Sequence, residues 1–297
     1  MSTENVTLYP SKTRIVPNIK LIKNVVSHST KDYQEMLSGD AGGVIEKRKH
    51  KKLGNIVTTY RLTNADGYDG TDPLDEFDYA VLSVCLSEFK ELNLDTTPAI
   101  ILRGLTGKTR ETHNGEVNAN QREWILNSVT KLMNTIITVD LSDINEKLGY
   151  EGEKKLTAPI LPCHYVTTII NGQPVRDVIH FTDESPILKI AESRSQFIRY
   201  DTSLLNVPNL RNTPRIITLK NYVLRRVFEI IAHKMTPTLT FEAIFEKAHI
   251  SDKDREAKVD ARAAVKAIFE YLQANGTIKT FEFVKKGVSV HAVNFTF

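Results

Sequence analysis

The sequence predicts an α+β protein with two tandem units, each made of three helices followed by a β-hairpin, and an N-terminal arm that contains short strands. The order helix, short helix, longer helix, hairpin occurs twice along the chain. A length of 297 residues also suits two domains of average size. We therefore divide the chain into an arm (1–65), a first unit (72–200) and a second unit (201–297).

The arm is rich in β-branched residues and carries a basic cluster. Short strands are predicted at 14–17 and 55–62, with the lysine- and arginine-rich cluster 47–52 between them. An acidic loop with two glycines, 66–72, separates the arm from the first helix. The basic cluster is either a contact to the DNA backbone or a solvated loop, and the sequence leaves both open.

Start and stop signals in the sequence predict the first two helices of the first unit. Asp72 suits the N-cap and Pro73 the first helical position. The second helix opens at Thr97-Pro98 and stops at Gly107. Apolar residues at three-and-four spacing predict one buried stripe on the first helix. These residues are Leu74, Phe77, Val81, Val84, Cys85 and Leu92.

The third helix of the first unit begins near Asn120, with Glu123 as its capping-box partner. Strands follow, and the last two are joined by an asparagine–glycine dipeptide, which is the strongest short hairpin signal. The predicted strands are 135–141, 163–170 and 174–181.

The second unit repeats this order. Thr213 begins its first helix, Ser251 caps its third helix with Asp254 at the box position, and Gly276 follows the end of that helix. The predicted helices are 213–234, 240–248 and 251–275, and the predicted strands are 277–284 and 288–295.

Two tandem winged-helix units explain this order. In a winged helix the third helix enters the DNA major groove and the hairpin, or wing, lies along the adjacent backbone. The third helix of the second unit carries four basic residues spaced three, four and four apart, which predicts one strip beside the buried stripe. The basic residues of this helix and of the hairpin tip are Arg255, Lys258, Arg262, Lys266, Lys285 and Lys286.

The basic strip allows two interpretations. Like charges at i,i+4 destabilise an isolated helix by about 0.2–0.5 kcal/mol per pair, and a polyanionic partner would reverse that sign. The alternative is a solvated amphipathic helix. The first unit offers fewer candidates for contacts to phosphates or base edges, and it serves equally well as a scaffold or dimer surface. Its candidates are Gln121, Arg122, Lys131, Lys108 and Arg110.

Composition excludes several protein classes. The chain is 25% charged and 41% hydrophobic, as in ordinary globular proteins. Cys85 and Cys163 are the only cysteines, which indicates a reducing cytoplasm rather than a disulfide framework. No signal peptide or membrane-spanning run is readable. The net charge is +3, but the last 97 residues carry 15 lysines and arginines against 10 acidic residues.

We find no motif for catalysis, a cofactor or a metal ion. The segment 104–109 ends like a phosphate-binding loop but has Leu102 where the motif needs glycine. His164 has no second histidine or cysteine at zinc-ligand spacing. The aspartates between 66 and 78 lack the register of a calcium loop. We therefore expect a protein that is not an enzyme and has no cofactor.

Two stretches, 97–107 (TPAIILRGLTG) and 212–226 (NTPRIITLKNYVLRR), resemble plasmid and phage replication initiators of the tandem winged-helix type. The resemblance covers 72–297 in architecture and only these stretches in sequence. It implies binding to repeated origin sites, origin opening, recruitment of host replication proteins and repression of the initiator's own promoter. Carried onto this chain, it makes 252–275 the base-reading helix, with three principal readers: Arg255, Lys258 and Arg262.

Our leading hypothesis is a sequence-specific double-stranded-DNA-binding initiator of plasmid or mobile-element replication, without catalytic activity. One alternative is a winged-helix transcription regulator. Another is a protein-interaction scaffold, in which the basic strip faces a partner protein. The oligomeric state, including a homodimer, stays open.

Overall fold

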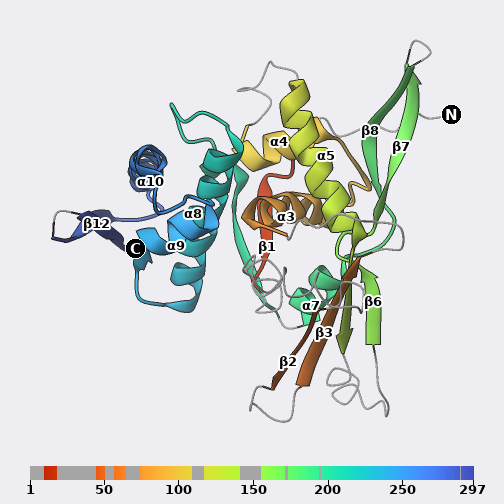
Figure 1. Cartoon of the computed structure of the whole chain (residues 1–297), viewed down its shortest axis with the longest axis horizontal. Helices are drawn as coiled ribbons and strands as arrows, with labels where there is room; N and C mark the ends of the chain where they lie inside the picture. Colours follow the sequence, from red (N-terminus) through yellow and green to blue (C-terminus); the bar gives the residue numbers. More distant parts are fainter. Residues whose placement is uncertain are drawn as a thin grey trace.

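The computed structural model describes residues 10–18, 45–50, 57–64, 74–108, 117–140, 155–170, 173–193, 195–287 and 289–297. These residues form an α+β fold in which helices gather in the middle and at one end, with several small sheets (Figure 1). In these ranges we find no helix that combines the length and the apolar character needed to cross a membrane.

The predicted helices occur in the predicted order, and α7 and η2 are additional helices that the sequence analysis did not predict. The helices are α3 (Glu76–Lys90), α4 (Pro98–Thr106), α5 (Ala119–Asn134), α7 (Pro186–Ser193), η2 (Thr202–Leu205), α8 (Pro214–His233), α9 (Phe241–Lys247) and α10 (Arg255–Ala274).

The strands form four antiparallel sheets with the orders β1-β9, β2-β3-β5-β6, β4-β8-β7 and β10-β12-β11. They are β1 (Thr13–Pro17), β2 (Ile45–His50), β3 (Val57–Asn64), β4 (Asp95–Thr96), β5 (Thr135–Asp140), β6 (Lys155–Pro159), β7 (Cys163–Ile170), β8 (Gln173–Phe181), β9 (Phe197–Asp201), β10 (Thr238–Thr240), β11 (Thr280–Lys286) and β12 (Ser289–Thr296).

The helix starts correct several predicted caps. The N-cap of α3 is Asp75, which forms a reciprocal capping box with Asp78; Asp72 and Pro73 lie outside the described residues. Asn118, and not Asn120, caps α5, and its partner is Gln121 rather than Glu123. The predicted and the observed N-cap are both residue types that cap helices well. The sequence alone therefore does not decide which of the two begins the helix.

In the second unit the predicted N-cap of α10 is also wrong, whereas the predicted starts of α8 and α9 are correct. The N-cap of α10 is Asp254, whose Oδ1 accepts a hydrogen bond from the Ala257 N–H at 2.9 Å, and not Ser251. Thr213 and Thr240 cap α8 and α9, and Gly276 has the positive φ of 71° expected after a helix end.

Strands of the arm are part of the sheets of the first unit. β1 pairs with β9, and β3 pairs with β5. Arg14 of β1 is 1% exposed and donates hydrogen bonds to the carbonyl oxygens of Ala80 (3.3 Å) and Gly104 (2.6 Å), while burial lowers its pKa. β1 is therefore a structural element of the core. The predicted acidic loop 66–72 and the turn 171–172 lie outside the described residues.

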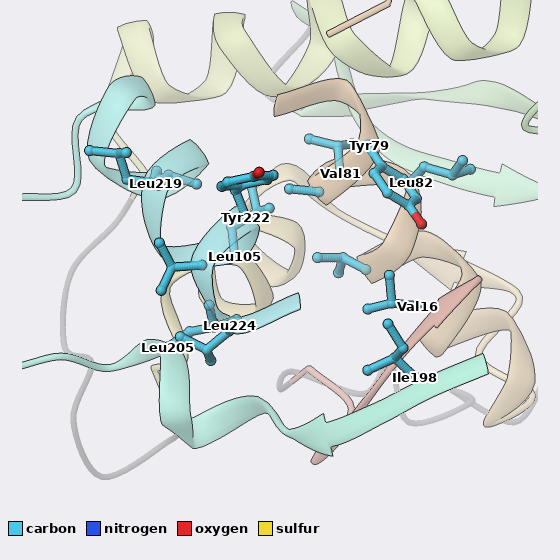
Figure 2. Packing of buried hydrophobic residues seen from close by; sticks show 14 of the residues in the cluster. Val16, Tyr79, Val81, Leu82, Leu105, Ile198, Leu205, Leu219, Tyr222 and Leu224 are labelled. Carbon is cyan, nitrogen blue, oxygen red and sulfur yellow. The ribbon is translucent and has the colours of Figure 1, made fainter. Parts of the chain in front are cut away.

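One hydrophobic core runs from β1 to α8 (Figure 2). Val16 and Ile198 line it from β1 and β9, and Leu105 and Leu224 line it from α4 and α8. α3 lies in its middle and is buried on almost every side, because β1, α4, α5 and α8 all pack against it. The predicted single stripe on α3 was too narrow, and Leu92, at its end, is 85% exposed.

A close backbone approach joins α4 to the segment that leads into α8. Gly107 has a φ of 68°, and a Cβ at this position would lie 2.4 Å from the Asn206 backbone nitrogen and 2.6 Å from the Thr202 carbonyl oxygen. Only glycine fits this conformation and this spacing. The end of α4 and η2 are thus held in direct backbone contact.

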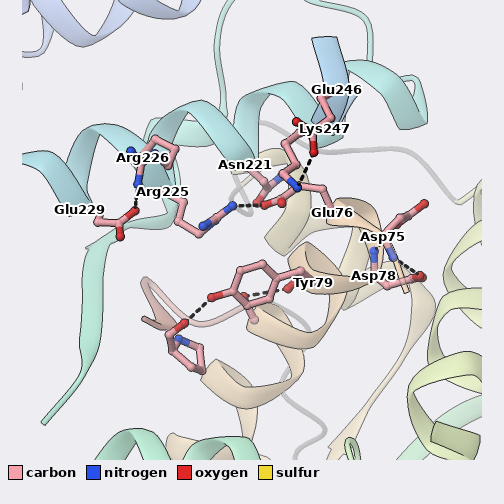
Figure 3. Close-up of polar contacts among 12 residues, drawn as sticks. Asp75, Glu76, Asp78, Tyr79, Asn221, Arg225, Arg226, Glu229, Glu246 and Lys247 are labelled. Carbon is pink, nitrogen blue, oxygen red and sulfur yellow. Dashed lines mark hydrogen bonds and ion pairs between the residues drawn. The ribbon is translucent and has the colours of Figure 1, made fainter. Parts of the chain in front are cut away.

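α8 connects the two units through buried polar side chains (Figure 3). Arg225 of α8 forms an ion pair with Glu76 of α3, and both side chains are buried. The Arg225 guanidinium also lies 4.9 Å from the ring centroid of Tyr79 and 5.3 Å from that of Tyr222. Asn221 donates a hydrogen bond to the Leu105 carbonyl oxygen of α4 at 3.1 Å.

Removing one member of the buried pair should be costly. We expect Glu76→Gln to lower the free energy of unfolding by about 3–5 kcal/mol, because it leaves the Arg225 charge buried without its counterion. Chemical denaturation measures the change. Glu270→Gln, at an exposed pair whose charged atoms are 3.6 Å apart, is the matched control and should cost under about 1 kcal/mol. Equal effects of the two substitutions would contradict the assignment.

Lys220 makes stability depend on pH. Its ammonium group is buried and donates to the Leu205 carbonyl oxygen and to Asn212 Oδ1, both at 2.9 Å. Burial, with a smaller contribution from Lys108, lowers the pKa of Lys220 to about 7. Between that pH and the ordinary lysine pKa, the unfolded chain binds more protons than the folded chain, so this group makes stability rise with pH.

We therefore expect the wild type to gain stability relative to Lys220→Met as the pH rises from about 7 to about 10. Parallel denaturant titrations at several pH values measure the difference. A constant difference over this interval would show that Lys220 does not titrate there.

Candidate nucleic-acid interface

The α10 helix and the β11–β12 hairpin form one packed unit at one end of the molecule (Figure 1). The Phe269 ring of α10 packs on Phe281 of β11 and Phe295 of β12, with ring centroids 5.5 and 5.7 Å apart. The hairpin is also tied to α9 through β10, which pairs with β12. The position of the hairpin relative to α10 is thus set by aromatic packing.

The hairpin tip carries the predicted lysines. Lys285 and Lys286 are exposed, and neither forms an ion pair with any part of the chain that the structure describes. Both residues still belong to β11, so the turn begins two residues later than predicted, at Gly287 with a φ of 63°. Two cationic side chains are therefore presented to solvent beside the turn.

The structure divides the predicted basic strip of α10 in two. Arg255 and Lys266 are exposed, whereas Lys258 and Arg262 are half-buried against α9. The four basic residues predicted to form one strip are therefore not equally available to a partner. Phe241 and Phe245 of α9 cover part of the flank beside the buried stripe, at Lys258 and Arg262.

Phe245 of α9 is central to this packing. The Arg262 guanidinium lies 5.3 Å from the Phe245 ring centroid and 5.8 Å from that of Phe241. Lys258 Nζ lies 5.4 Å from the Phe245 centroid and forms an ion pair with Asp252 Oδ1 at 2.8 Å. These two cations hold α9 against α10, and Lys258 is neutralised within the chain.

The outward face of α10 is mixed in charge. Val259, at the centre, is 61% exposed, and Ala263 is exposed one turn further on. The exposed carboxylates on this helix are Glu256, Asp260 and Glu270. Such a surface repels phosphates, but carboxylates can accept hydrogen bonds from cytosine and small apolar groups can contact thymine methyls. Its chemistry fits base edges better than the DNA backbone.

Sequence reasoning did not single out Val259 or Ala263. A signal existed, because both fall outside the buried stripe formed by Ala261, Val265 and Leu272. Single exposed apolar residues are common on protein surfaces, so this signal is weak without the hairpin beside the helix.

The candidates of the first unit are largely engaged within the fold. The Gln121 side chain accepts a hydrogen bond from the Asn118 backbone N–H at 3.3 Å, and Lys131 forms an ion pair with Asp78 at 3.4 Å. Arg122 and Lys108 are half-buried, and Arg110 lies outside the described residues. Gln121 and Lys131 therefore have structural roles that the sequence did not reveal.

The turn between α9 and α10 rests on the first unit. His249, with a φ of 52°, places its Nε2 3.7 Å from Asp75 Oδ2 at the start of α3. The Asp75 carboxylate raises the pKa of His249, while burial beside Asp75 raises the pKa of Asp78 to about 6. The His249 side chain is 70% exposed, so this contact adds only modestly to the packing of the second unit against α3.

No protein-family model matches the chain, and no curated protein matches it. Among solved structures, two of domains 2 and 3 of RctB are similar. One matches with a TM-score of 0.43 and 9% identity over 85% of this chain and 90% of that chain. The other matches with a TM-score of 0.43 and 10% identity over 86% and 91%. A likeness of this size carries no conclusion about the fold or function of this chain.

The two kinds of cation on α10 should respond differently to removal. We expect Arg262→Ala to lower the free energy of unfolding by about 1–2 kcal/mol, because the guanidinium and its stem pack on two aromatic rings. Arg255→Ala should change it by under about 0.5 kcal/mol, since that side chain is exposed. Thermal and denaturant unfolding of both variants test this contrast, and the reverse order would show that the flank packing is not stabilising.

Proposed function

We propose that the chain is a double-stranded-DNA-binding protein that uses residues 214–297 as a winged helix. The α10 helix would enter the major groove, and the β11–β12 hairpin would follow the neighbouring backbone. The observation that carries the proposal is the hairpin tip, where Lys285 and Lys286 project without acidic partners among the described residues, next to a helix with an open outward face.

In this proposal the residues that contact base edges differ from those that the sequence suggested. Arg255, in the first turn of α10, is the candidate for guanine, and Val259 and Ala263 are candidates for contacts to thymine methyls. Lys258 and Arg262 stabilise the α9–α10 pair and do not read bases. Lys285 and Lys286 contact phosphates and contribute affinity without sequence information.

We further propose that the first unit is a second winged helix, formed by α3, α4, α5 and the β7–β8 hairpin. Its element order supports this, although strand β5 lies between the third helix and the hairpin. Because Gln121 and Lys131 are engaged within the fold, this unit acts chiefly as a scaffold for the second.

The finer proposal is initiation of plasmid or mobile-element replication at origin repeats, without a catalytic activity of the chain itself. It rests on the resemblance of 97–107 and 212–226 to replication initiators. In the structure these stretches meet in the core, where Asn221 hydrogen-bonds to the Leu105 carbonyl oxygen. The resemblance therefore supports the proposal that this chain joins its two units as replication initiators do. A role at an origin is tested by DNA binding.

Binding to duplex DNA tests the function directly. A footprint of the full chain on the DNA that flanks its gene should protect repeated sites, and affinity should fall steeply as salt is raised. We expect Lys285→Gln/Lys286→Gln to reduce the slope of log affinity against log salt by about 1.8, which is two phosphate contacts. Lys189→Gln, at a half-buried lysine of α7 that pairs with Asp183, is a control far from the hairpin and should leave the slope unchanged.

Arg255→Ala should weaken binding to the specific site by about 1–3 kcal/mol and leave non-specific binding nearly unchanged. Absence of binding to any duplex at low salt would contradict the proposed function. Binding only upstream of a gene would favour a transcription regulator, and capture of a protein partner that DNA fails to displace would favour a scaffold.

A further inference from the structure

Three polar side chains lie in a row across the β4-β8-β7 sheet. His180, on the central strand, is directly opposite His164 on one side and directly opposite Asp95 on the other. Residues opposite each other in an antiparallel pair project from the same face of the sheet. This hairpin lies at the other end of the molecule from α10 (Figure 1).

The hydrogen bond to Asp95 sets the tautomer of His180. His180 Nδ1 lies 2.7 Å from Asp95 Oδ1. An ionised carboxylate can only accept, so Nδ1 donates its hydrogen and the lone pair of neutral His180 is on Nε2. A carboxylate on the non-ligating nitrogen is the usual arrangement around histidines that bind metal ions.

The spacing of the two imidazoles fits one tetrahedral ion. Zinc binds histidine nitrogen at about 2.0–2.1 Å, so each ring centroid would lie about 3.2 Å from the metal, and a tetrahedral angle would separate the centroids by about 5.2 Å. The centroids of His164 and His180 are 5.1 Å apart, with the rings tilted by 46°.

The site is open to solvent, which leaves room for the remaining ligands. His164 is exposed, and the His180 side chain is 35% exposed. Within the described ranges no three or more histidine, cysteine, aspartate or glutamate side chains are grouped to hold a metal ion. Among the described residues, a bound ion would therefore have two protein ligands, and water could fill its other positions.

We propose that His164 and His180 bind one divalent ion of the zinc, nickel and copper class, and that Asp95 is a positioning residue for His180. Imidazole nitrogens are preferred ligands of these ions. The two histidines belong to different strands of a hairpin, so they share no zinc-ligand motif in the sequence. The proposal is independent of the proposed DNA binding.

Calorimetric titration of the full-length chain with Zn²⁺ tests the site. We expect one ion per chain, and a loss of affinity of at least tenfold in His164→Asn and in His180→Asn. Asp95→Asn should weaken binding by about 10–100-fold while both ligands remain, and Asp95→Glu should recover part of the loss. With Co²⁺ as a spectroscopic probe, the wild type should show tetrahedral visible absorption that Asp95→Asn shifts.

His291→Asn, at an exposed histidine on β12, is the matched control and should bind Zn²⁺ as the wild type does. Circular dichroism checks that each variant is folded. The proposal is overturned if the double variant His164→Asn/His180→Asn binds as tightly as the wild type, if His291→Asn loses as much affinity, or if the wild type binds only adventitiously at millimolar metal.

Discussion

The arrangement of the two units depends on the buried ion pair between Arg225 of α8 and Glu76 of α3. The two buried charges must stay in contact, because either charge buried without its partner would strongly destabilise the fold. The pair is enclosed by Tyr79 and Tyr222, whose rings lie against the guanidinium, so few other placements of α8 would satisfy it. Hydrophobic packing would tolerate small shifts of α8 along α3, and the ion pair does not.

Because α8 is also the first helix of the second unit, its placement determines where α10 points. The contact between His249 and Asp75 lies at the same end of α3, because Asp75 directly precedes Glu76 in the chain. The hairpin and α10 are then oriented by aromatic packing around Phe269. The packing of α3 on α8 and of α8 on α10 thus connects the first unit to the surface that we assign to DNA, and the second unit is not carried on a loose linker.

Local signals predicted the helices and the second hairpin well. Thr213 before Pro214, and Gly276 after α10, mark helix ends through the backbone of a few residues. Neighbouring capping residues compete on equal terms, which explains why Ser251 was preferred over Asp254. The pairing of β1 with β9 and of β3 with β5 joins distant segments, and no local pattern specifies it.

The candidate site was predicted only in part, because local spacing does not show which distant segments pack against it. Helical spacing predicts on which side of α10 Lys258 and Arg262 lie. It does not predict that aromatic side chains of α9 pack against that side. The lysines of the hairpin tip depend only on local sequence and were placed almost correctly. The three polar residues across β4, β8 and β7 follow from strand register, which spacing along the chain does not encode.

The pairing of β1 with β9 has a consequence for how the chain is made. Thr202 Oγ1 donates a hydrogen bond to the Ser11 carbonyl oxygen, a contact that spans 191 residues. At a synthesis rate of about 5–20 residues per second, β1 leaves the ribosome some 10–40 s before its partner exists. During that interval α3 and α4, which accept the hydrogen bonds of Arg14, are already synthesised, whereas the edge of β1 that pairs with β9 has no partner strand.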